Sequence, residues 1–236
     1  MAEKGSVVII GGTTIFGTIL AKHYVAEGRK VYVSSRSQES ADALAKEIGG
    51  NCEGLAVDLI KMHDIKAALS DVKDVDRLVL IAIMRDASSI RDYNVDGSSN
   101  FIISKLVGYT AVINALVPEM REDASICIYG GNAREWPYPG STSVTIANGG
   151  ITTMVNTLGV ELAPIRVNAI HPSVVGDSPN WLAKPDAVRE IHRSRTTIGR
   201  LVRADEIVDA TIFLLENAAV TGVNLTVDGG TNLRTH

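Results

Sequence analysis

Short apolar runs of strand length alternate with longer segments of helical period along the whole chain. Ser6–Ile10 is a β-branched run that two glycines close, and residues 16–27 repeat apolar side chains at helical spacing before Gly28. In residues 77–83, every residue after Arg77 is apolar, which is typical of a strand covered on both faces. The pattern predicts strands at 6–10, 30–34, 54–57, 77–83, 125–129, 166–171 and 224–227, and helices at 16–27, 39–48, 65–69, 100–120, 146–162 and 205–215.

This alternation predicts an α/β fold of the Rossmann type. Strands joined by helices run parallel through right-handed crossovers, so we expect a doubly wound parallel sheet of about seven strands with helices on both faces. The sequence has no internal repeat or linker-like stretch, which indicates one domain over residues 1–236. Residues 173–195 are rich in Pro, Ser and Asp, and we expect them to form a loop with short helices that acts as a substrate lid.

Charge and composition exclude several kinds of partner. The net charge of -4 gives no positive field for nucleic acid or an anionic membrane. No uninterrupted apolar run has the length of a membrane span, and no apolar signal segment precedes the first strand, so we expect a cytoplasmic protein. Cys52 and Cys127 are far apart and lie in apolar stretches, so we interpret them as reduced, buried thiols.

The first strand leads through a glycine-rich loop into the first helix. A helix N-terminus offers unpaired N–H groups and partial positive charge to a pyrophosphate. In this loop Gly11 permits a tight turn and Gly17 permits close packing of helix on sheet. An ordinary glycine turn is the alternative. The position of the loop favours nucleotide binding by Gly11, Thr13, Thr14, Phe16 and Gly17.

The end of the second strand indicates which dinucleotide binds. NAD sites usually place a carboxylate there for the ribose hydroxyls. This chain has Ser35 and Arg36 instead, and a hydroxyl with a guanidinium suits a ribose phosphate. NADP(H) is therefore the expected cofactor, although Arg36 would also serve as a solvated surface residue. Asp58, after the third strand, is placed to bond the adenine amino group.

The C-terminal half carries the most specific resemblance. Residues 161–172, the Gly199-Arg200-Leu201 turn and residues 221–230 resemble the short-chain dehydrogenase/reductase family, and the likeness extends over essentially the whole chain. The resemblance implies a small-molecule substrate and cofactor contacts from Pro172 and Val174. It also implies a homodimer or homotetramer built through the helices around 100–120 and 146–162.

The resemblance also locates the family's catalytic positions. The Tyr-x-x-x-Lys pair falls on Val144 and Asn148, the catalytic serine on Gly131, and the active-site asparagine on Lys105. No shift of register restores the pair, because no lysine occurs between Lys105 and Lys184. Loss of a general acid typically costs about 10²–10⁴-fold in rate. Ordinary ketone reduction or alcohol oxidation is therefore not expected.

Three functions are compatible with such a site. The first is NADP(H)-dependent reduction of an imine, an iminium or a conjugated C=C bond, which needs no acid at a developing alkoxide. The second is a non-redox cyclase, isomerase or lyase on the same scaffold, and the third is a catalytically silent NADP(H)-binding or sensor protein. The sequence is also similar to a minority branch of the family that includes fungal alkaloid enzymes, but Trp136-Pro137-Tyr138-Pro139-Gly140 lacks both charges of that branch's loop.

Candidate pocket residues follow from the resemblance, each with an alternative. Tyr138 can bring a phenol into the cleft or pack as a loop aromatic. Asn148 can bond the nicotinamide ribose or a substrate carbonyl. Lys105 can place a cation near the nicotinamide or replace the asparagine structurally. The expected catalytic residues are thus Tyr138, Asn148 and Lys105.

Five further residues are expected to contact an apolar or aromatic substrate. Trp136 and Trp181 would form the walls of its pocket, with core or interface packing as the alternative. Arg134 and Asp177 would orient polar groups or pair with each other, and Val144 lines the cleft. The histidines lack partner spacing, and no metal site is visible in the sequence.

Overall fold

Seven parallel strands form one sheet in the computed structural model, which describes residues 4–82 and 84–233. The sheet order is β3-β2-β1-β4-β5-β6-β7, and every neighbouring pair is parallel. The predicted α/β fold with a doubly wound parallel sheet is confirmed. The strands are β1 (Ser6–Ile10), β2 (Val31–Ser35), β3 (Cys52–Ala56), β4 (Val75–Leu80), β5 (Met120–Tyr129), β6 (Arg166–Pro172) and β7 (Asn224–Val227).

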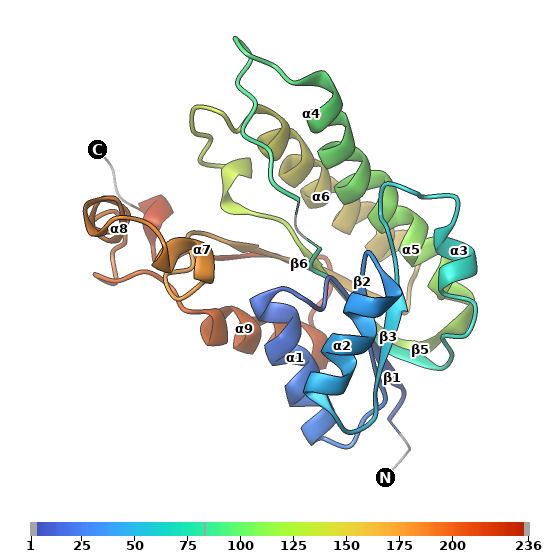
Figure 1. The fold of residues 1–236 in the computed structure, drawn as a ribbon. Helices are drawn as coiled ribbons and strands as arrows, with labels where there is room; N and C mark the ends of the chain where they lie inside the picture. Colours follow the sequence, from blue (N-terminus) through green and yellow to red (C-terminus); the bar gives the residue numbers. More distant parts are fainter. Residues whose placement is uncertain (1–3, 83, 234–236) are drawn as a thin grey trace.

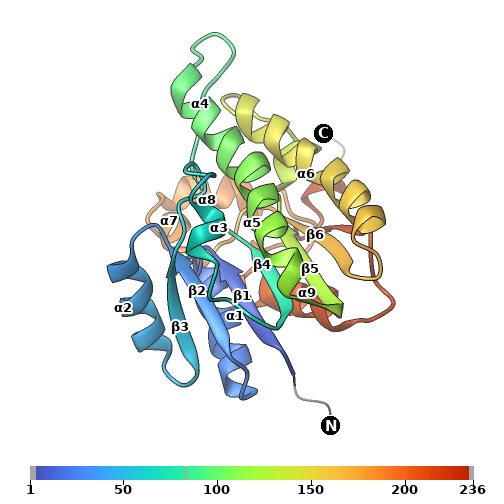
Figure 2. The same ribbon diagram turned by 90° about the vertical axis from the view of Figure 1, so that its right-hand side faces the viewer.

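Helices cover both faces of this sheet, so its central strands β1 and β4 are buried on two sides (Figure 1). Side chains alternate across β1: Val7 and Ile9 belong to one buried cluster, and Val8 and Ile10 to the other. The first face is covered by α1 (Ile15–Ala26), α2 (Gln38–Ile48) and α9 (Ala204–Glu216). The second is covered by α3 (Ile65–Ala68), α5 (Tyr109–Leu116) and α6 (Thr142–Glu161), with α3 beside α5 in Figure 2.

One long helical segment runs from Val95 to Glu119 and contains an irregular turn. It consists of α4 (Val95–Ile102), the π-helix η1 (Ile103–Gly108), α5 and the 3₁₀ turn η2 (Val117–Glu119). It begins five residues before the predicted start at 100, because the Asn94 side chain caps it by accepting the Gly97 N–H at 3.0 Å. By length and composition alone this segment would be able to cross a membrane, although polar residues such as Asn100 and Lys105 interrupt its apolar runs. Packing accounts for its apolar character, since α5 is buried against the sheet.

Several element boundaries differ from the predicted ones. Strand β5 begins at Met120, which pairs with Val75 at the start of β4, so both strands begin earlier than expected. Strand β4 ends at Leu80, and the last residue of the predicted strand, Ile83, lies outside the described residues. Helix α6 begins one turn before residue 146. Cys52 is only half-buried at the start of β3, which corrects the interpretation of both thiols as buried.

The segment 173–195 is a loop with short helices, as expected. It contains α7 (Pro179–Leu182) and α8 (Asp186–Arg193), and the two are joined by an edge-to-face contact between the rings of Trp181 and His192, whose centroids are 4.7 Å apart. The remaining short turns are η3 (Asn132–Arg134) after β5 and η4 (Thr231–Leu233) after β7.

Replacement of a core leucine in α1 tests the packing of this helix on the sheet. Leu20 is fully buried, so Leu20→Ala should lower the free energy of unfolding by about 2–5 kcal/mol. Urea unfolding followed by circular dichroism measures this. The matched control is Leu182→Ala, at a leucine that is 57% exposed, where a change within about 0.5 kcal/mol is expected. Equal losses in both variants would contradict this account of the core.

Candidate nucleotide and substrate site

The sheet topology creates a crevice at the carboxyl ends of the strands. From β1 the chain continues to β2 on one side, whereas β4 lies on the other side of β1. The strand order therefore changes direction between β1 and β4, and open α/β sheets bind ligands outside the carboxyl ends at such a point. The loop between β1 and α1 lies there.

Close backbone approach makes two glycines necessary in this loop. Gly11 has a φ of +99°, and a Cβ added to it would lie 2.5 Å from the Ala82 nitrogen. A Cβ added to Gly17 would lie 2.7 Å from the Gly11 oxygen. The roles predicted for Gly11 in the turn and for Gly17 in helix packing agree with these contacts. The Ser34 hydroxyl fixes the turn further by accepting the Gly11 N–H at 3.0 Å.

The N-terminus of α1 presents backbone donors to this crevice. The Thr14 hydroxyl donates to the Gly11 oxygen at 2.9 Å and accepts the Gly17 N–H at 3.0 Å, so this side chain caps the helix. The N–H groups of Thr13, Ile15 and Phe16 have no hydrogen-bond acceptor within residues 4–82 and 84–233. Such donors at a helix N-terminus fit the pyrophosphate of a dinucleotide.

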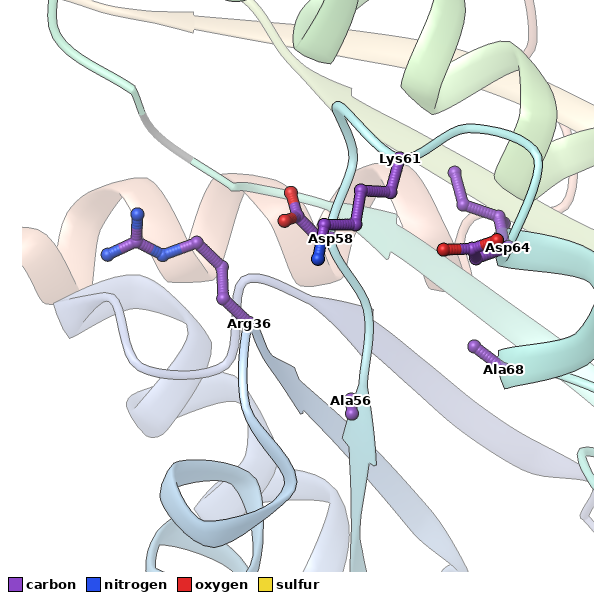
Figure 3. Close-up of a pocket in the computed structure, with 7 residues that line it drawn as sticks. Arg36, Ala56, Asp58, Lys61, Asp64 and Ala68 are labelled. Atoms are coloured by element: carbon purple, nitrogen blue, oxygen red, sulfur yellow. The ribbon is translucent and has the colours of Figure 1, made fainter.

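A small cavity of about 170 Å³ lies beyond β2 and β3 and brings together two of the predicted cofactor residues (Figure 3). Arg36 reaches it from the end of β2, and Asp58 from the end of β3. The sequence analysis missed Lys61, which lines the same cavity and extends toward Asp58 from the following turn. The available signal was a cation in the turn after β3, which the hydrogen bond from the Lys61 N–H to the Asp58 oxygen closes.

The other predicted cofactor residues lie along the same edge of the sheet. Ser35 ends β2, and its carbonyl accepts the Val57 N–H at 2.8 Å. Pro172 ends β6, and Val174 follows it, half-buried, before the segment that carries α7 and α8.

Lys105 is buried at the end of β5, in the π-helix η1. Its ammonium donates to the Tyr129 oxygen at 3.0 Å, to the Gly130 oxygen at 3.1 Å and to Asn148 Oδ1 at 3.0 Å. These oxygens favour the protonated form, but burial opposes it and lowers the pKa of Lys105 to about 7. The protonated ammonium has three N–H donors, so none remains for a ligand in that form.

Asn148 lies beside Gly131 on the other side of this contact. It is 2% exposed, and a Cβ added to Gly131 would lie 2.7 Å from its Nδ2 atom. The amide nitrogen thus occupies space that a side chain at position 131 would need. Within the part of the chain that the structure describes, Asn148 Nδ2 has no hydrogen-bond acceptor, whereas Oδ1 is engaged by Lys105.

His171 completes the support of this strand end. Its Nδ1 accepts the Gly131 N–H at 3.2 Å, and its Nε2 lies 2.9 Å from Asn224 Oδ1. Burial lowers the pKa of His171 to about 4, so the ring is neutral and Nε2–H donates to Asn224. With both nitrogens engaged and no exposed surface, His171 is structural.

Two expected substrate residues are held elsewhere, and the expectation that they pair with each other is wrong. Arg134 forms an ion pair with Glu135 at 2.8 Å and also donates to hydroxyls of α6 and β7. Asp177 accepts the Ala204 N–H at 2.9 Å and so caps α9. Arg134 is therefore engaged by Glu135 and Asp177 by the N-terminus of α9, and neither is engaged by the other.

The aromatic candidates are divided among different surroundings. Tyr138 lines an open groove of about 490 Å³ with the 89–91 loop, and partial burial raises the pKa of its phenol. Trp136 lies two residues before it and is 38% exposed. Trp181 packs on His192 instead, and Val144 is half-buried in the first turn of α6. Of these four residues, Tyr138 lines the groove.

In the described residues no cluster of three His, Cys, Asp or Glu side chains is arranged to hold a metal ion.

Comparison with known proteins places this geometry in context. The family model described as "Enoyl-(Acyl carrier protein) reductase" matches residues 15–232. A 3-oxoacyl-[acyl-carrier-protein] reductase of Bos taurus is 26% identical over 95% of this chain and 97% of its own. Carbonyl reductase family member 4 of Danio rerio is 30% identical over 96% of this chain and 97% of its own.

Solved structures show the same fold. A small-chain dehydrogenase in complex with NADPH has a TM-score of 0.83 at 24% identity, covering 98% of this chain and 100% of that one. The MalC reductase/Diels-Alderase of Malbranchea aurantiaca has a TM-score of 0.86 at 21% identity, covering 98% of this chain and 97% of that one.

The burial of Lys105 predicts a pH-dependent stability. Above a folded-state pKa of about 7 the folded protein releases this proton, whereas the unfolded chain keeps it up to about pH 10.4. The unfolded state then binds more protons, so this group makes stability rise with pH between these values, by at most about 1.4 kcal/mol per pH unit. Urea unfolding of the natural chain and of Lys105→Met from pH 6 to pH 10 measures the difference. The control Lys22→Met replaces an exposed lysine, and its difference in stability from the natural chain should not change with pH. A constant difference for Lys105→Met would contradict the lowered pKa.

Proposed function

The chain belongs to the short-chain dehydrogenase/reductase family, in the group that the enoyl-(acyl carrier protein) reductase model describes, and on this basis we propose that it is an NADP(H)-dependent reductase of an activated double bond. The substrate is a small imine, iminium or conjugated C=C compound with apolar or aromatic character. One observation carries the proposal. By the family resemblance, the proton-donating tyrosine falls on Val144, a hydrocarbon side chain in the first turn of α6.

The choice of chemistry follows from this missing acid. Hydride addition to a ketone creates an alkoxide, which must receive a proton in place. Hydride addition to an iminium gives a neutral amine, and addition to a conjugated C=C bond gives an anion that water can protonate at carbon. The last two reactions do not need a phenol at position 144.

The residues at the nucleotide end support a phosphorylated dinucleotide. The unpaired N–H groups of Thr13, Ile15 and Phe16 would hold the pyrophosphate, and Arg36 and Lys61 would pair with a ribose phosphate. No carboxylate occupies the end of β2, where NAD sites usually carry one. When bound, NADPH supplies the hydride.

The remaining parts of the proposal concern the substrate and the assembly. Trp136 and Tyr138 lie on the loop after β5, and Trp181 on the segment 173–195, which we propose as a lid over an apolar or aromatic substrate. The family relationship supports one domain over residues 1–236 and a homodimer or homotetramer.

Turnover on a substrate panel tests the proposed function. NADPH oxidation at 340 nm is followed with cyclic imines, iminium salts, enones and simple ketones, and products are identified by mass spectrometry. We expect reduction of at least one activated class and no reduction of ketones. NADPH binding without any turnover would contradict the proposal and favour a sensor. A product formed without change of oxidation state would favour the non-redox alternative.

Removal of Arg36 tests the choice of dinucleotide. Arg36→Ala should weaken NADPH binding about tenfold, because one charge-assisted contact to the ribose phosphate is lost, and should leave NADH binding within about threefold. Isothermal titration calorimetry of both nucleotides measures this. Arg91→Ala, which removes an exposed arginine from the groove near Tyr138, is the matched control and should leave both affinities unchanged. Equal weakening of the two nucleotides by Arg36→Ala would contradict the assignment of NADP(H).

A further inference from the structure

The main chain directly after β7 holds both ends of the proposed lid. At the start of the lid, the Ser173 N–H donates to the Val227 oxygen at 3.2 Å. Just past its end, the Gly229 oxygen accepts the N–H groups of Thr197 and Ile198 at 3.0 and 3.2 Å. The two ends of the lid therefore share one anchor.

One carboxylate folds the chain that follows this anchor into a turn. Asp228 Oδ1 accepts the Gly230 N–H at 2.8 Å, and Asp228 Oδ2 accepts the Asn232 N–H at 2.9 Å. Gly230 has a φ of +76°, and a Cβ added to it would lie 1.8 Å from Thr197 Oγ1, so the turn lies directly on the chain that leaves the lid. The position of Asn232 is thus tied to that of the lid end.

The Asn232 side chain connects this turn to the loop after β5. Asn132 Nδ2 donates to Asn232 Oδ1 at 2.7 Å, and Asn232 Nδ2 donates to Asn132 Oδ1 at 2.8 Å. Asn232 Nδ2 also donates to Glu135 Oε2 at 3.1 Å. A carboxamide carries both donors and an acceptor, so two of them can pair through two parallel hydrogen bonds that fix their relative orientation. This half-buried pair joins segments that are 100 residues apart in the sequence.

The pair also determines where the aromatic part of the loop lies. Arg134 anchors the root of the loop by donating to the hydroxyls of Thr152 in α6 and Thr226 in β7, at 3.2 and 3.1 Å. The Asn132 oxygen accepts the Trp136 N–H at 3.0 Å. One member of the carboxamide pair therefore holds the main chain of this tryptophan.

We propose that Asn232 is a positioning residue that couples the lid to the loop after β5. The chain has two tryptophans, Trp136 on that loop and Trp181 on the lid, and the coupling makes these two segments move as one unit. This inference rests on the proposed function, in which the two segments are walls of the substrate site. The carboxamide pair sets the spacing of the walls, so it acts on substrate binding and leaves hydride transfer unchanged.

Tryptophan fluorescence tests the coupling in the full chain without a substrate. Trp181→Phe leaves Trp136 as the one tryptophan, and Trp136→Phe leaves Trp181. In each background Asn132→Leu should raise the acrylamide quenching constant about twofold, because the pair that restrains both segments is lost. The rise for Trp181 is the decisive result, since Asn132 belongs to the other segment.

A double replacement separates the pair from a general loss of structure. Asn232→Leu should give the same rises as Asn132→Leu, and the double variant should add little to either, because all three lack the same interaction. Should a leucine variant not fold, Asn132→Ser and Asn232→Ser remove the pair with a smaller change. The matched control is Asn51→Leu, at an exposed asparagine before β3, which should leave both quenching constants unchanged. An unchanged constant for Trp181 in the Asn132 variants, or additive effects of the two replacements, would overturn the inference.

Steady-state kinetics separate this inference from the proposed function. 2-Cyclohexen-1-one and N-methyl-3,4-dihydroisoquinolinium are each offered with NADPH. For a probe that is reduced, Asn232→Leu should raise KM about fivefold and leave kcat within about twofold, because the walls lose their spacing while the hydride donor stays in place. A lower kcat at an unchanged KM would contradict the role in substrate binding. If neither probe is reduced, the proposed function fails, whereas the fluorescence results still decide the coupling.

Discussion

The parallel direction of all seven strands is the constraint on which the site depends. Because every neighbouring pair is parallel, the carboxyl ends of the strands meet at one edge of the sheet. The glycine loop, Arg36, Asp58 and Gly131 each follow a different strand within a few residues, and the fold alone brings them together. Burial on both faces makes the strands apolar, so polar chemistry is confined to the loops at their ends. The same sheet can therefore carry different reactions with changes in few loop and helix positions.

A buried ammonium imposes a second constraint at that edge. A charge that leaves water must recover its hydrogen bonds inside the protein, or it loses its proton. Lys105 recovers three, and two of them are with the main-chain oxygens that end β5. The lysine lies in the π-helix η1, and π-helical turns often occur at functional sites. The irregular turn, the strand end and the Asn148 carboxamide are thus one hydrogen-bonded unit.

Sequence reasoning recovered the features that depend on local pattern. β-Branched runs gave the strands, and alternation with helices gave the parallel sheet. Strand ends gave Arg36 and Asp58, which do line one cavity. What depends on packing between distant segments was not predictable. The contact between Lys105 and Asn148 requires two helices to meet, so both roles of Lys105 stayed open until the structure was known. Asp177 failed as an expected partner of Arg134 because a helix N-terminus 27 residues further on takes its carboxylate.

The two unusual features of the site lead to one chemical requirement. Val144 cannot deliver a proton, and a carboxamide such as Asn148 donates a hydrogen bond but does not transfer its proton. A localised alkoxide would remain unprotonated in such surroundings. An enolate differs, because its charge is shared between oxygen and carbon: the oxygen needs a hydrogen bond, and the carbon can take its proton from water. Under the proposed function, with Val144 at the position of the family's tyrosine, hydride addition to a conjugated C=C bond is therefore favoured over addition to a ketone.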